Sequence, residues 1–248
     1  MADAMTDQDV DEAISAALKP RPVPPGFADI GRERTRPISL PPWFIDRCRQ
    51  AYLAVPFEER EGQVRRVLGI TSAVHGEGKT SIAIGIAVAM AADTAEPTLL
   101  VETDFASSVG FEEVFGLKGG PGLAGWLEGL NQLRLVRAAP LENAFVLPAG
   151  DPGPDPTRLV FRLTNSDLID KFRASFPNIV IDLPPMLNIA YSSLASRLAE
   201  KILVIARYGR TMVDDLEKVM FLLGRERVAG VVLNDYNPKT PSSLRRLL

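Results

Sequence analysis

The chain has 248 residues, of which 46% are hydrophobic and 24% charged, the proportions of an ordinary globular protein. Its net charge of −3 argues against a nucleic-acid partner, because nucleic-acid-binding domains carry an excess of positive charge. The single cysteine, Cys48, excludes an internal disulfide and fits a reducing compartment. No apolar N-terminal segment with a basic flank is seen, and the longest apolar run, from Ile82 to Ala92, is too short to span a bilayer. We therefore expect a cytoplasmic protein.

Residues 1–42 are predicted to form a mostly disordered arm. A proline-rich segment buries little surface and resists regular structure. A partner-docking role and a tail without function are both open for this arm. A first ordered helix is expected over 43–56, where apolar residues recur with helical spacing. The prolines are Pro20, Pro22, Pro24, Pro25, Pro37, Pro41 and Pro42.

A strand, a glycine turn and a helix are predicted between residues 66 and 92. Gly76 and Gly78 allow the turn to curl with its N–H groups pointing inward, and the free N–H groups of the helix start add to this phosphate-binding nest. The pattern matches a phosphate-binding loop, although Ala73 replaces its first glycine, so that Lys79 would reach the phosphates and Thr80 would bind Mg²⁺. A chance match in an ordinary loop is the alternative. The predicted nucleotide-site residues of this loop are His75, Gly76, Glu77, Gly78, Lys79, Thr80 and Ser81.

Two further predicted strands end in carboxylates. The strand over 98–104 is apolar until Glu102 and Asp104, whose period-2 spacing places both side chains on the same side of an extended chain. The strand over 178–182 ends in Asp182, which is followed by two prolines. Ligands of open α/β sheets lie beyond the carboxyl ends of the strands. These acids are therefore candidates for holding Mg²⁺ or accepting a proton, with a solvated strand end as the alternative.

The rest of the chain continues the alternation of strands and helices. We expect further strands at 143–147, 201–206 and 228–233, and helices from 122, at 157–163, at 167–176 and at 211–223. Thr211 and Asp214 have the spacing of a capping box at the start of the last helix. The alternation predicts an α/β fold with a mostly parallel sheet and helices on both faces, as in P-loop NTPases. We assign this domain to residues 43–237, followed by a short tail over 238–248.

The predicted motifs occur in the order found in one protein family. Over about residues 43–237, the chain resembles the cytoplasmic domain of the bacterial tyrosine kinases (BY-kinases). This family works with capsular and exopolysaccharide co-polymerases and lies within the MinD/ParA-like P-loop ATPases. The motifs are His75-Gly76-Glu77-Gly78-Lys79-Thr80, Leu99-Leu100-Val101-Glu102-Thr103-Asp104-Phe105, Phe115-Gly116-Leu117, Leu147-Pro148-Ala149-Gly150, Val180-Ile181-Asp182 with Pro184-Pro185, and Gly230-Val231-Val232-Leu233-Asn234.

The resemblance implies ATP and Mg²⁺ as cofactors and phosphotransfer to tyrosine as the activity. It implies a membrane polysaccharide co-polymerase as the activating partner, a place at the inner face of the cell membrane through that partner, and assembly into a homo-oligomer. Asn234 would lie near the adenine. By the same resemblance, the catalytic residues would be Lys79, Glu102, Asp104 and Asp182, and the metal-binding residues Thr80, Asp104 and Asp182.

Several positions depart from the family pattern. Glu102 stands where the family has Asp, and a longer side chain places its carboxylate differently. Asp46, Arg49 and Tyr52 stand at the three positions of the helix motif that the family uses for ring assembly, and two of these positions are changed. The C-terminal tyrosine cluster of the family is missing. The tyrosines of this chain are Tyr52, Tyr191, Tyr208 and Tyr236.

These departures leave two other functions open. The first is a pseudokinase, a nucleotide switch that binds ATP and changes the shape of its loops without transferring phosphate to protein. The second is a MinD/ParA-type positioning ATPase. Val74 counts against the second alternative, because that class carries a lysine at this place in the loop.

Overall fold

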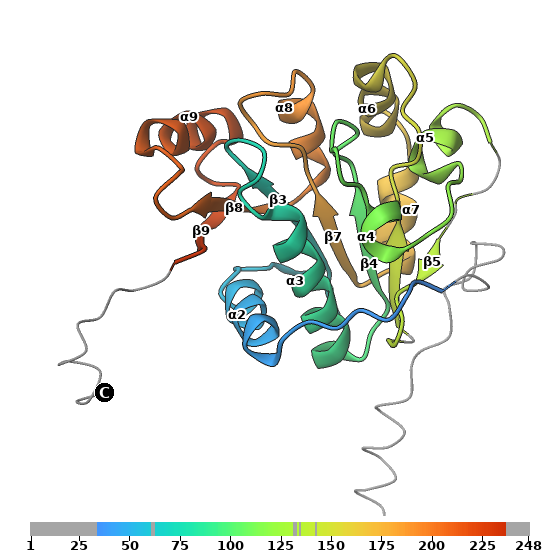
Figure 1. Cartoon of the computed structure of the whole chain (residues 1–248), viewed down its shortest axis with the longest axis horizontal. Coiled ribbons are helices and arrows are strands. Elements are labelled where there is room, and N and C mark those ends of the chain that lie inside the picture. Colours follow the sequence, from blue (N-terminus) through green and yellow to red (C-terminus); the bar gives the residue numbers. More distant parts are fainter. Residues whose placement is uncertain (1–33, 61–62, 131–132, 134, 142, 237–248) are drawn as a thin grey trace, which may run out of the picture.

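A seven-stranded sheet forms the centre of the computed structural model, which describes residues 34–60, 63–130, 133, 135–141 and 143–236. The strand order is β5-β6-β4-β7-β3-β8-β9, and only the β5–β6 pair is antiparallel. This sheet confirms the predicted α/β fold (Figure 1). Its strands are β3 (Arg66–Ser72), β4 (Thr98–Glu102), β5 (Val136–Arg137), β6 (Ala144–Leu147), β7 (Asn178–Asp182), β8 (Lys201–Arg207) and β9 (Val228–Asn234), and β1 (Glu59–Arg60) with β2 (Gln63–Val64) forms a separate hairpin.

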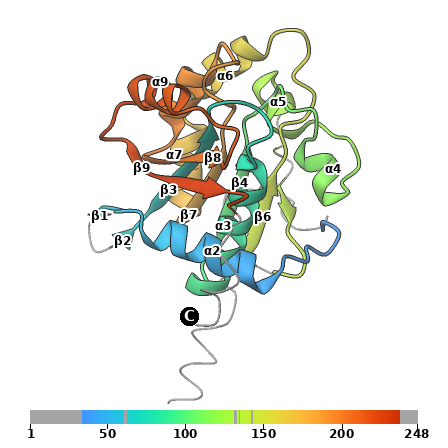
Figure 2. The same ribbon diagram turned by 60° about the vertical axis from the view of Figure 1, so that its left-hand side comes forward.

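Alternate residues of the central strands bury their side chains on opposite faces of the sheet. Leu68, Leu100 and Val180 belong to a core shared with α2, α3 and α4. Leu99 and Ile179 belong to a second core shared with α5, α6 and α7. Figures 1 and 2 show the resulting layers. The helices are α2 (Pro42–Leu53), α3 (Lys79–Thr94), α4 (Phe111–Phe115), α5 (Gly122–Leu127), α6 (Pro156–Thr164), α7 (Leu168–Ser175), α8 (Ser192–Ala195) and α9 (Val213–Leu223).

Helix α3 is buried on nearly all sides because α2 covers the face that the sheet leaves open. Gly85 of α3 lies against Cys48 and Phe44 of α2, and a Cβ at Gly85 would come within 2.5 Å of the Cys48 sulfur. A glycine is therefore needed where the two helices approach. Burial raises the pKa of the Cys48 thiol to about 12, so this cysteine packs as an apolar residue.

The predicted strands at 66–71, 143–147, 178–182, 201–206 and 228–233 are present as β3, β6, β7, β8 and β9. Three predicted boundaries are wrong. The helix expected over 43–56 ends at Leu53. The strand expected over 98–104 ends at Glu102, where the chain turns. Helix α9 begins at Val213, and its N-cap, Met212, makes no side-chain capping bond. The capping box does not form because the Thr211 hydroxyl is used elsewhere, donating to Glu77 and accepting from the N–H of Arg207.

The predicted N-terminal arm lies outside the described residues up to residue 33, as does the tail over 238–248. Residues 34–41 are described, and they lie against the domain instead of extending away from it. The N–H of Thr35 donates to the carbonyl of Arg137 at 3.0 Å, and that of Ile38 donates to Ala139 at 3.0 Å. The Arg36 side chain donates to the Val114 carbonyl at the end of α4. This segment therefore forms a strap across β5 and α4, and the packed chain begins earlier than residue 43.

None of the helices in the described part of the chain has both the length and the hydrophobicity that a membrane crossing requires.

Candidate functional site

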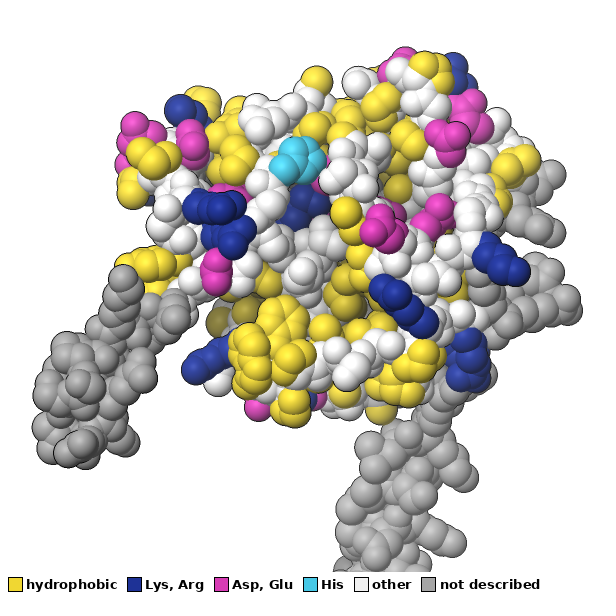
Figure 3. Space-filling model, viewed as in Figure 1, with side chains coloured by type: hydrophobic (Ala, Val, Ile, Leu, Met, Phe, Trp, Pro, Cys, Tyr) yellow, Lys and Arg dark blue, Asp and Glu magenta, His cyan; other side chains and the backbone are white. Residues whose placement is uncertain are grey.

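The carboxyl ends of β3, β4 and β7 meet at one edge of the sheet. The loop between β3 and α3 curls over this edge and lines a pocket of about 520 Å³. Figure 3 shows a histidine side chain at the rim of this region, with basic side chains beside it. The position agrees with the expectation that a ligand lies beyond the strand ends. Residues lining the pocket are His75, Gly76, Gly78, Lys79, Thr80, Ser81, Ala106, Ser107, Ser108, Val109 and Val114.

The curled loop depends on two glycines and on internal braces. Gly76 and Gly78 have φ angles of 82° and 94°, which favour glycine. The buried Glu77 accepts from the N–H of Val74 at 2.9 Å and from Thr211, so it holds the loop together from inside. The Asn234 amide donates to the Glu77 carbonyl at 2.9 Å, and a Cβ at Gly78 would collide with that amide. These contacts within the chain define the shape of the loop.

Four polar side chains converge beneath the loop. The Lys79 ammonium lies 2.8 Å from Asp104 Oδ2 and 3.4 Å from Asp182 Oδ1. The Thr80 hydroxyl donates to Asp182 Oδ2 at 2.7 Å. Lys79, Asp104 and Asp182 are all buried, so one cation faces two carboxylates away from water. Such a cluster carries an excess of negative charge that a divalent cation can neutralise.

The surroundings shift the proton affinities of these groups. Burial alone would lower the pKa of Lys79, but the carboxylates of Asp182 and Asp104 outweigh it and raise this pKa above its usual value. Lys79 is therefore a permanent cation at neutral pH. Burial raises the pKa of Asp182, and the Lys79 charge and the Thr80 hydroxyl offset this only in part. Bringing Mg²⁺ to the site would favour the ionised carboxylate.

Glu102 and Asp104 both line a pocket of about 250 Å³, but they make different contacts. Asp104 contacts Lys79, whereas Glu102 contacts two loops. Glu102 Oε1 accepts from the N–H of Phe111 at 3.0 Å, and Oε2 accepts from the N–H of Ala149 at 2.9 Å. Burial raises the pKa of Glu102 to about 7, although these two hydrogen bonds lower it. In this structure Glu102 joins the loops after β4 and β6.

The donor set at the foot of the pocket fits Mg²⁺. The Thr80 hydroxyl and the Asp182 carboxylate are hard oxygen donors 2.7 Å apart, and Asp104 lies on the other side of Lys79. Within the described residues, no group of three or more His, Cys, Asp or Glu side chains could hold a metal by itself. This arrangement suits Mg²⁺, which keeps several waters and is completed by substrate phosphates.

The sequence did not point to Arg207, which ends β8. Its guanidinium donates to the Gly76 carbonyl at 3.2 Å and forms an ion pair with Asp235 at 2.8 Å. Thr211 was also assigned a different role, as the cap of α9. Both residues contact the loop from β8 and the turn after it, and β8 is the neighbour of β3 in the sheet. Only the position of β8 beside β3 brings them to the loop, so no local pattern could have found them.

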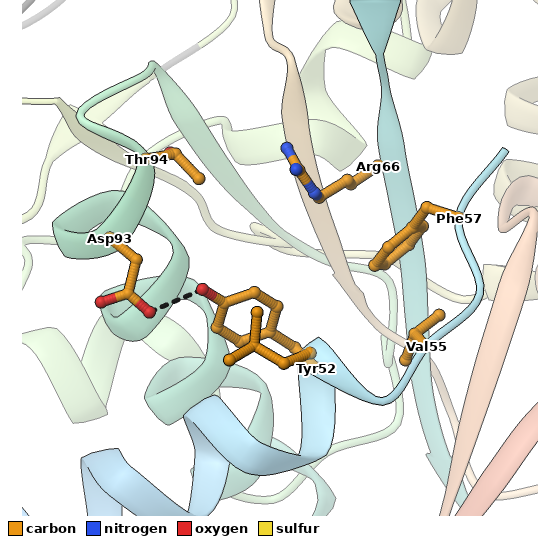
Figure 4. A pocket seen from close by; sticks show the side chains of 7 residues that line it. Tyr52, Val55, Phe57, Arg66, Asp93 and Thr94 are labelled. Carbon is orange, nitrogen blue, oxygen red and sulfur yellow. Dashed lines mark hydrogen bonds between the residues drawn. The ribbon is translucent and has the colours of Figure 1, made fainter. Parts of the chain in front are cut away.

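A second pocket, of about 500 Å³, lies near the opposite end of α3. Figure 4 shows Tyr52 and Asp93 facing Arg66 and Phe57 across it. The Tyr52 hydroxyl donates to Asp93 at 2.6 Å, and the same carboxylate accepts from Arg49 at 2.8 Å. Arg49 and Tyr52, both in the reduced assembly motif, therefore bond within this chain to α3.

Comparison with known proteins supports the kinase resemblance. The chain is 28% identical over 195 residues to the tyrosine-protein kinase CpsD of Streptococcus pneumoniae serotype 4, covering 77% of this chain and 86% of CpsD. The crystal structure of the VpsO kinase domain is similar at a TM-score of 0.62 with 26% identity, covering 70% of this chain and 86% of that one. No family model matches the chain.

The fold extends beyond the kinases. The septum site-determining protein MinD of Pyrococcus horikoshii, solved in complex with Mg-ADP, is similar at a TM-score of 0.60 with 20% identity. The similarity covers 75% of this chain and 78% of MinD, and at this identity it concerns the fold alone.

Proposed function

Because the chain is a relative of the bacterial tyrosine kinases, with a fold related to the MinD/ParA P-loop ATPases, we propose that it binds Mg-ATP and transfers the γ-phosphate to tyrosine. The observation that carries this proposal is the cluster of the buried Lys79, Asp104 and Asp182 with Thr80 beneath the glycine loop. The proposed biological role is regulation of capsular or exopolysaccharide assembly, as the family resemblance implies.

Each residue of the cluster has a proposed task. Lys79 would leave its carboxylate partners to neutralise the β- and γ-phosphates. Thr80 and Asp182 would hold Mg²⁺ and its waters, and the Mg²⁺ would neutralise charge on the phosphates. Asp104, released from Lys79, would accept the proton of the attacking hydroxyl. Loop N–H groups around Gly76 and Gly78 would bind phosphate oxygens, and Asn234 would lie near the adenine.

Glu102 would act through the loops and not on the phosphate. Its two oxygens are occupied by the N–H groups of Phe111 and Ala149, so the carboxylate supports the walls of the site. We propose it as a positioning residue. The sequence offered two acids, Glu102 and Asp104, as candidates for accepting the proton. With this assignment, only Asp104 keeps that proposed role.

The partner that fits the resemblance is a membrane polysaccharide co-polymerase whose cytoplasmic tail activates the kinase. Such a partner would place the chain at the inner face of the cell membrane. A pull-down of the chain with the cytoplasmic tail of a neighbouring co-polymerase, with and without ATP, tests this part of the proposal.

Isothermal titration calorimetry tests the nucleotide site. The wild-type chain is expected to bind Mg-ATP, and Lys79→Ala is expected to abolish binding because the phosphates lose their main cation. Lys171→Ala, which removes an exposed lysine from α7, is the matched control and should bind as the wild type does. Unchanged affinity in Lys79→Ala would contradict the assignment of the loop. Mass spectrometry after incubation with Mg-ATP then tests for phosphotyrosine.

The placement of Glu102 favours one second candidate, the nucleotide switch without phosphotransfer. Both loops held by Glu102 border the pocket region, so nucleotide binding could move them and be read by a partner. Slow ATP hydrolysis with no phosphoprotein would support this function over the kinase.

A further inference from the structure

The proposed nucleotide pocket has two walls that come from different parts of the chain. One wall is the phosphate loop with the start of α3, and the other is the segment that leads into α4. Residues 106–109 of this second wall precede α4, and Val114 belongs to α4 itself. The position of α4 therefore sets the distance between the second wall and the phosphate loop.

Side chains from distant segments hold α4 at both ends. At its start, Glu102 accepts from the N–H of Phe111 at 3.0 Å. At its end, the Arg36 guanidinium donates to the Val114 carbonyl from Nε at 3.0 Å and from Nη2 at 2.7 Å, and to the Glu113 carbonyl at 3.4 Å. The last carbonyls of a helix have no partner within the helix. A helix of five residues makes few bonds of its own, so α4 depends on these outside contacts.

The backbone of the strap over 34–41 holds Arg36 in place. The N–H of Arg36 donates to the Phe115 carbonyl at 3.1 Å. The buried Thr35 donates its N–H to the Arg137 carbonyl at 3.0 Å, and its hydroxyl accepts from the N–H of Ala139 at 3.0 Å. Figure 1 shows the strap passing β5 and α4 on its way to α2. The guanidinium therefore reaches α4 from a segment that is bonded to the edge of the sheet.

A cavity of about 270 Å³ lies between the strap and the start of α3. Residues 36–40 of the strap line it on one side. Ser81 and Val114 line both this cavity and the nucleotide pocket. The strap is thus one layer of side chains away from the nucleotide pocket, and the cavity leaves space into which the end of α4 can move when Arg36 is lost.

From these contacts we propose that Arg36 is a positioning residue of the nucleotide site. By holding the end of α4, it keeps Val114 and residues 106–109 at the distance from the phosphate loop that Mg-ATP binding requires. Arg36 does not line the nucleotide pocket, so its effect passes through α4. This inference rests on the proposed nucleotide site and extends it to a segment that precedes the domain expected over 43–237.

Isothermal titration calorimetry of the full chain with Mg-ATP tests the inference. Arg36→Ala is expected to weaken binding about 2- to 30-fold, the range for residues that act on a site through packed contacts. Arg36→Lys keeps the charge but lacks the planar fork, so its affinity should lie between the two. Arg158→Ala removes an exposed arginine that bonds to Glu128, and this control should bind as the wild type does.

Hydrogen exchange provides a measurement that a merely structural role of Arg36 would not change. If the strap favours nucleotide binding, the nucleotide must favour the bonded strap by the same free energy. Saturating Mg-ATP is therefore expected to slow exchange of the Arg36 and Ile38 N–H groups in the wild type, beyond any slowing seen in α7. This additional slowing should be smaller in Arg36→Ala.

The outcomes separate this inference from the proposed function. If Arg36→Ala is less stable to urea but binds Mg-ATP as the wild type does, Arg36 is only a structural contact and the nucleotide site stands. Equal weakening in Arg36→Ala and Arg158→Ala would equally contradict the role of α4. If Arg36→Ala does not fold, Arg36→Lys and the exchange of the wild type decide the question. If the wild type binds no Mg-ATP, the proposed function falls and the inference falls with it.

Discussion

Both ends of α3 carry charged side chains, but the two ends satisfy their charges differently. In the first turn, Lys79 is buried with Asp104 and Asp182, so one cation faces two carboxylates. In the last turn, Asp93 lies at the surface and is shared by Arg49 and Tyr52 of α2. Arg49 also bonds to Asp46, so in both clusters one cation faces two carboxylates, but only the Lys79 cluster is buried and adjoins the glycine loop. The comparison teaches that the two ends of α3 differ in burial: water screens the exposed charges, whereas the buried charges depend on one another.

Removing the cation from the first turn should have the largest effect on stability. Lys79→Ala leaves two buried carboxylates without their partner, and breaking a buried ion pair costs about 3–5 kcal/mol of unfolding free energy. Urea unfolding of the nucleotide-free chain measures it. Lys171→Ala breaks an exposed pair with Asp167 and should cost about 0–1 kcal/mol. Equal losses in the two variants would contradict the distinction between buried and exposed charge.

Changing the acid beside Thr80 should weaken the binding of Mg²⁺ without weakening the binding of the nucleotide itself. Asp182→Asn removes the charge that would hold Mg²⁺ and its waters, so the Mg²⁺ concentration needed for ATP binding should rise about 10- to 100-fold. Binding of ATP without Mg²⁺ should not weaken, because Lys79 loses one of its two competing carboxylates. Calorimetric titrations across Mg²⁺ concentrations measure both effects. Asp170→Asn on the surface of α7 is the control, and an unchanged Mg²⁺ requirement in Asp182→Asn would refute the metal assignment.

A substitution at the contacts of the last turn of α3 should lower the stability of the chain and leave its nucleotide affinity unchanged. Tyr52→Phe removes a hydrogen bond to a carboxylate and should cost about 1.5 kcal/mol of unfolding free energy, with Mg-ATP affinity unchanged. Denaturant unfolding and calorimetry on the same variant measure the two quantities. A large loss of nucleotide affinity would show that the two ends of α3 are coupled.

The pH dependence of stability tests the same comparison between the two ends of α3. Burial acts to raise the pKa of Asp93, but the hydrogen bonds from Arg49 and Tyr52 and the Arg49 charge outweigh it and lower the pKa below its usual 3.8. A lowered native pKa contributes stability that is present above pH 3.8 and is lost as the pH falls through the native value. Asp93→Asn should abolish this loss, and a stability profile that is identical to wild type below pH 4 would contradict it.

Glu102 should give a pH dependence of stability with the opposite sign. Its pKa is raised from 4.5 to about 7, so the native state holds a proton that the unfolded state has lost between these values. Stability should therefore fall as the pH rises from about 4.5 to 7 and should become level above it. Glu102→Gln cannot titrate, so its melting temperature should lack this slope. The same slope in both proteins would assign it to other groups.

The sequence predicted the elements well where patterns are local. The apolar strands β3 and β7 and the run that became α3 have a burial pattern that can be read from the residues alone. The two-residue strand β5 was missed because its length carries no periodic pattern. The strap over 34–41 was missed because its prolines suggested disorder, whereas its backbone bonds to β5 and α4.

The side chains that converge beneath the loop were named from the sequence, whereas the contacts that support the loop were missed. Lys79, Thr80 and Asp182 were found because each sits in a motif next to a strand end. The hydrogen bonds of Glu102 could not be predicted, since its partners, Phe111 and Ala149, are nine and forty-seven residues away. Arg207 reaches Gly76 across 131 positions, which no spacing rule connects.

The amino-acid sequence by itself determined the alternation of strands and helices, the phosphate loop and the three acids after the strands, because hydrophobic period and glycine placement act over a few residues. Tertiary structure alone decided which acid meets Lys79, which braces hold the loop and which segment supports α4. Those contacts depend on strand order and on where each strand ends, and both are set by packing between segments distant in the chain.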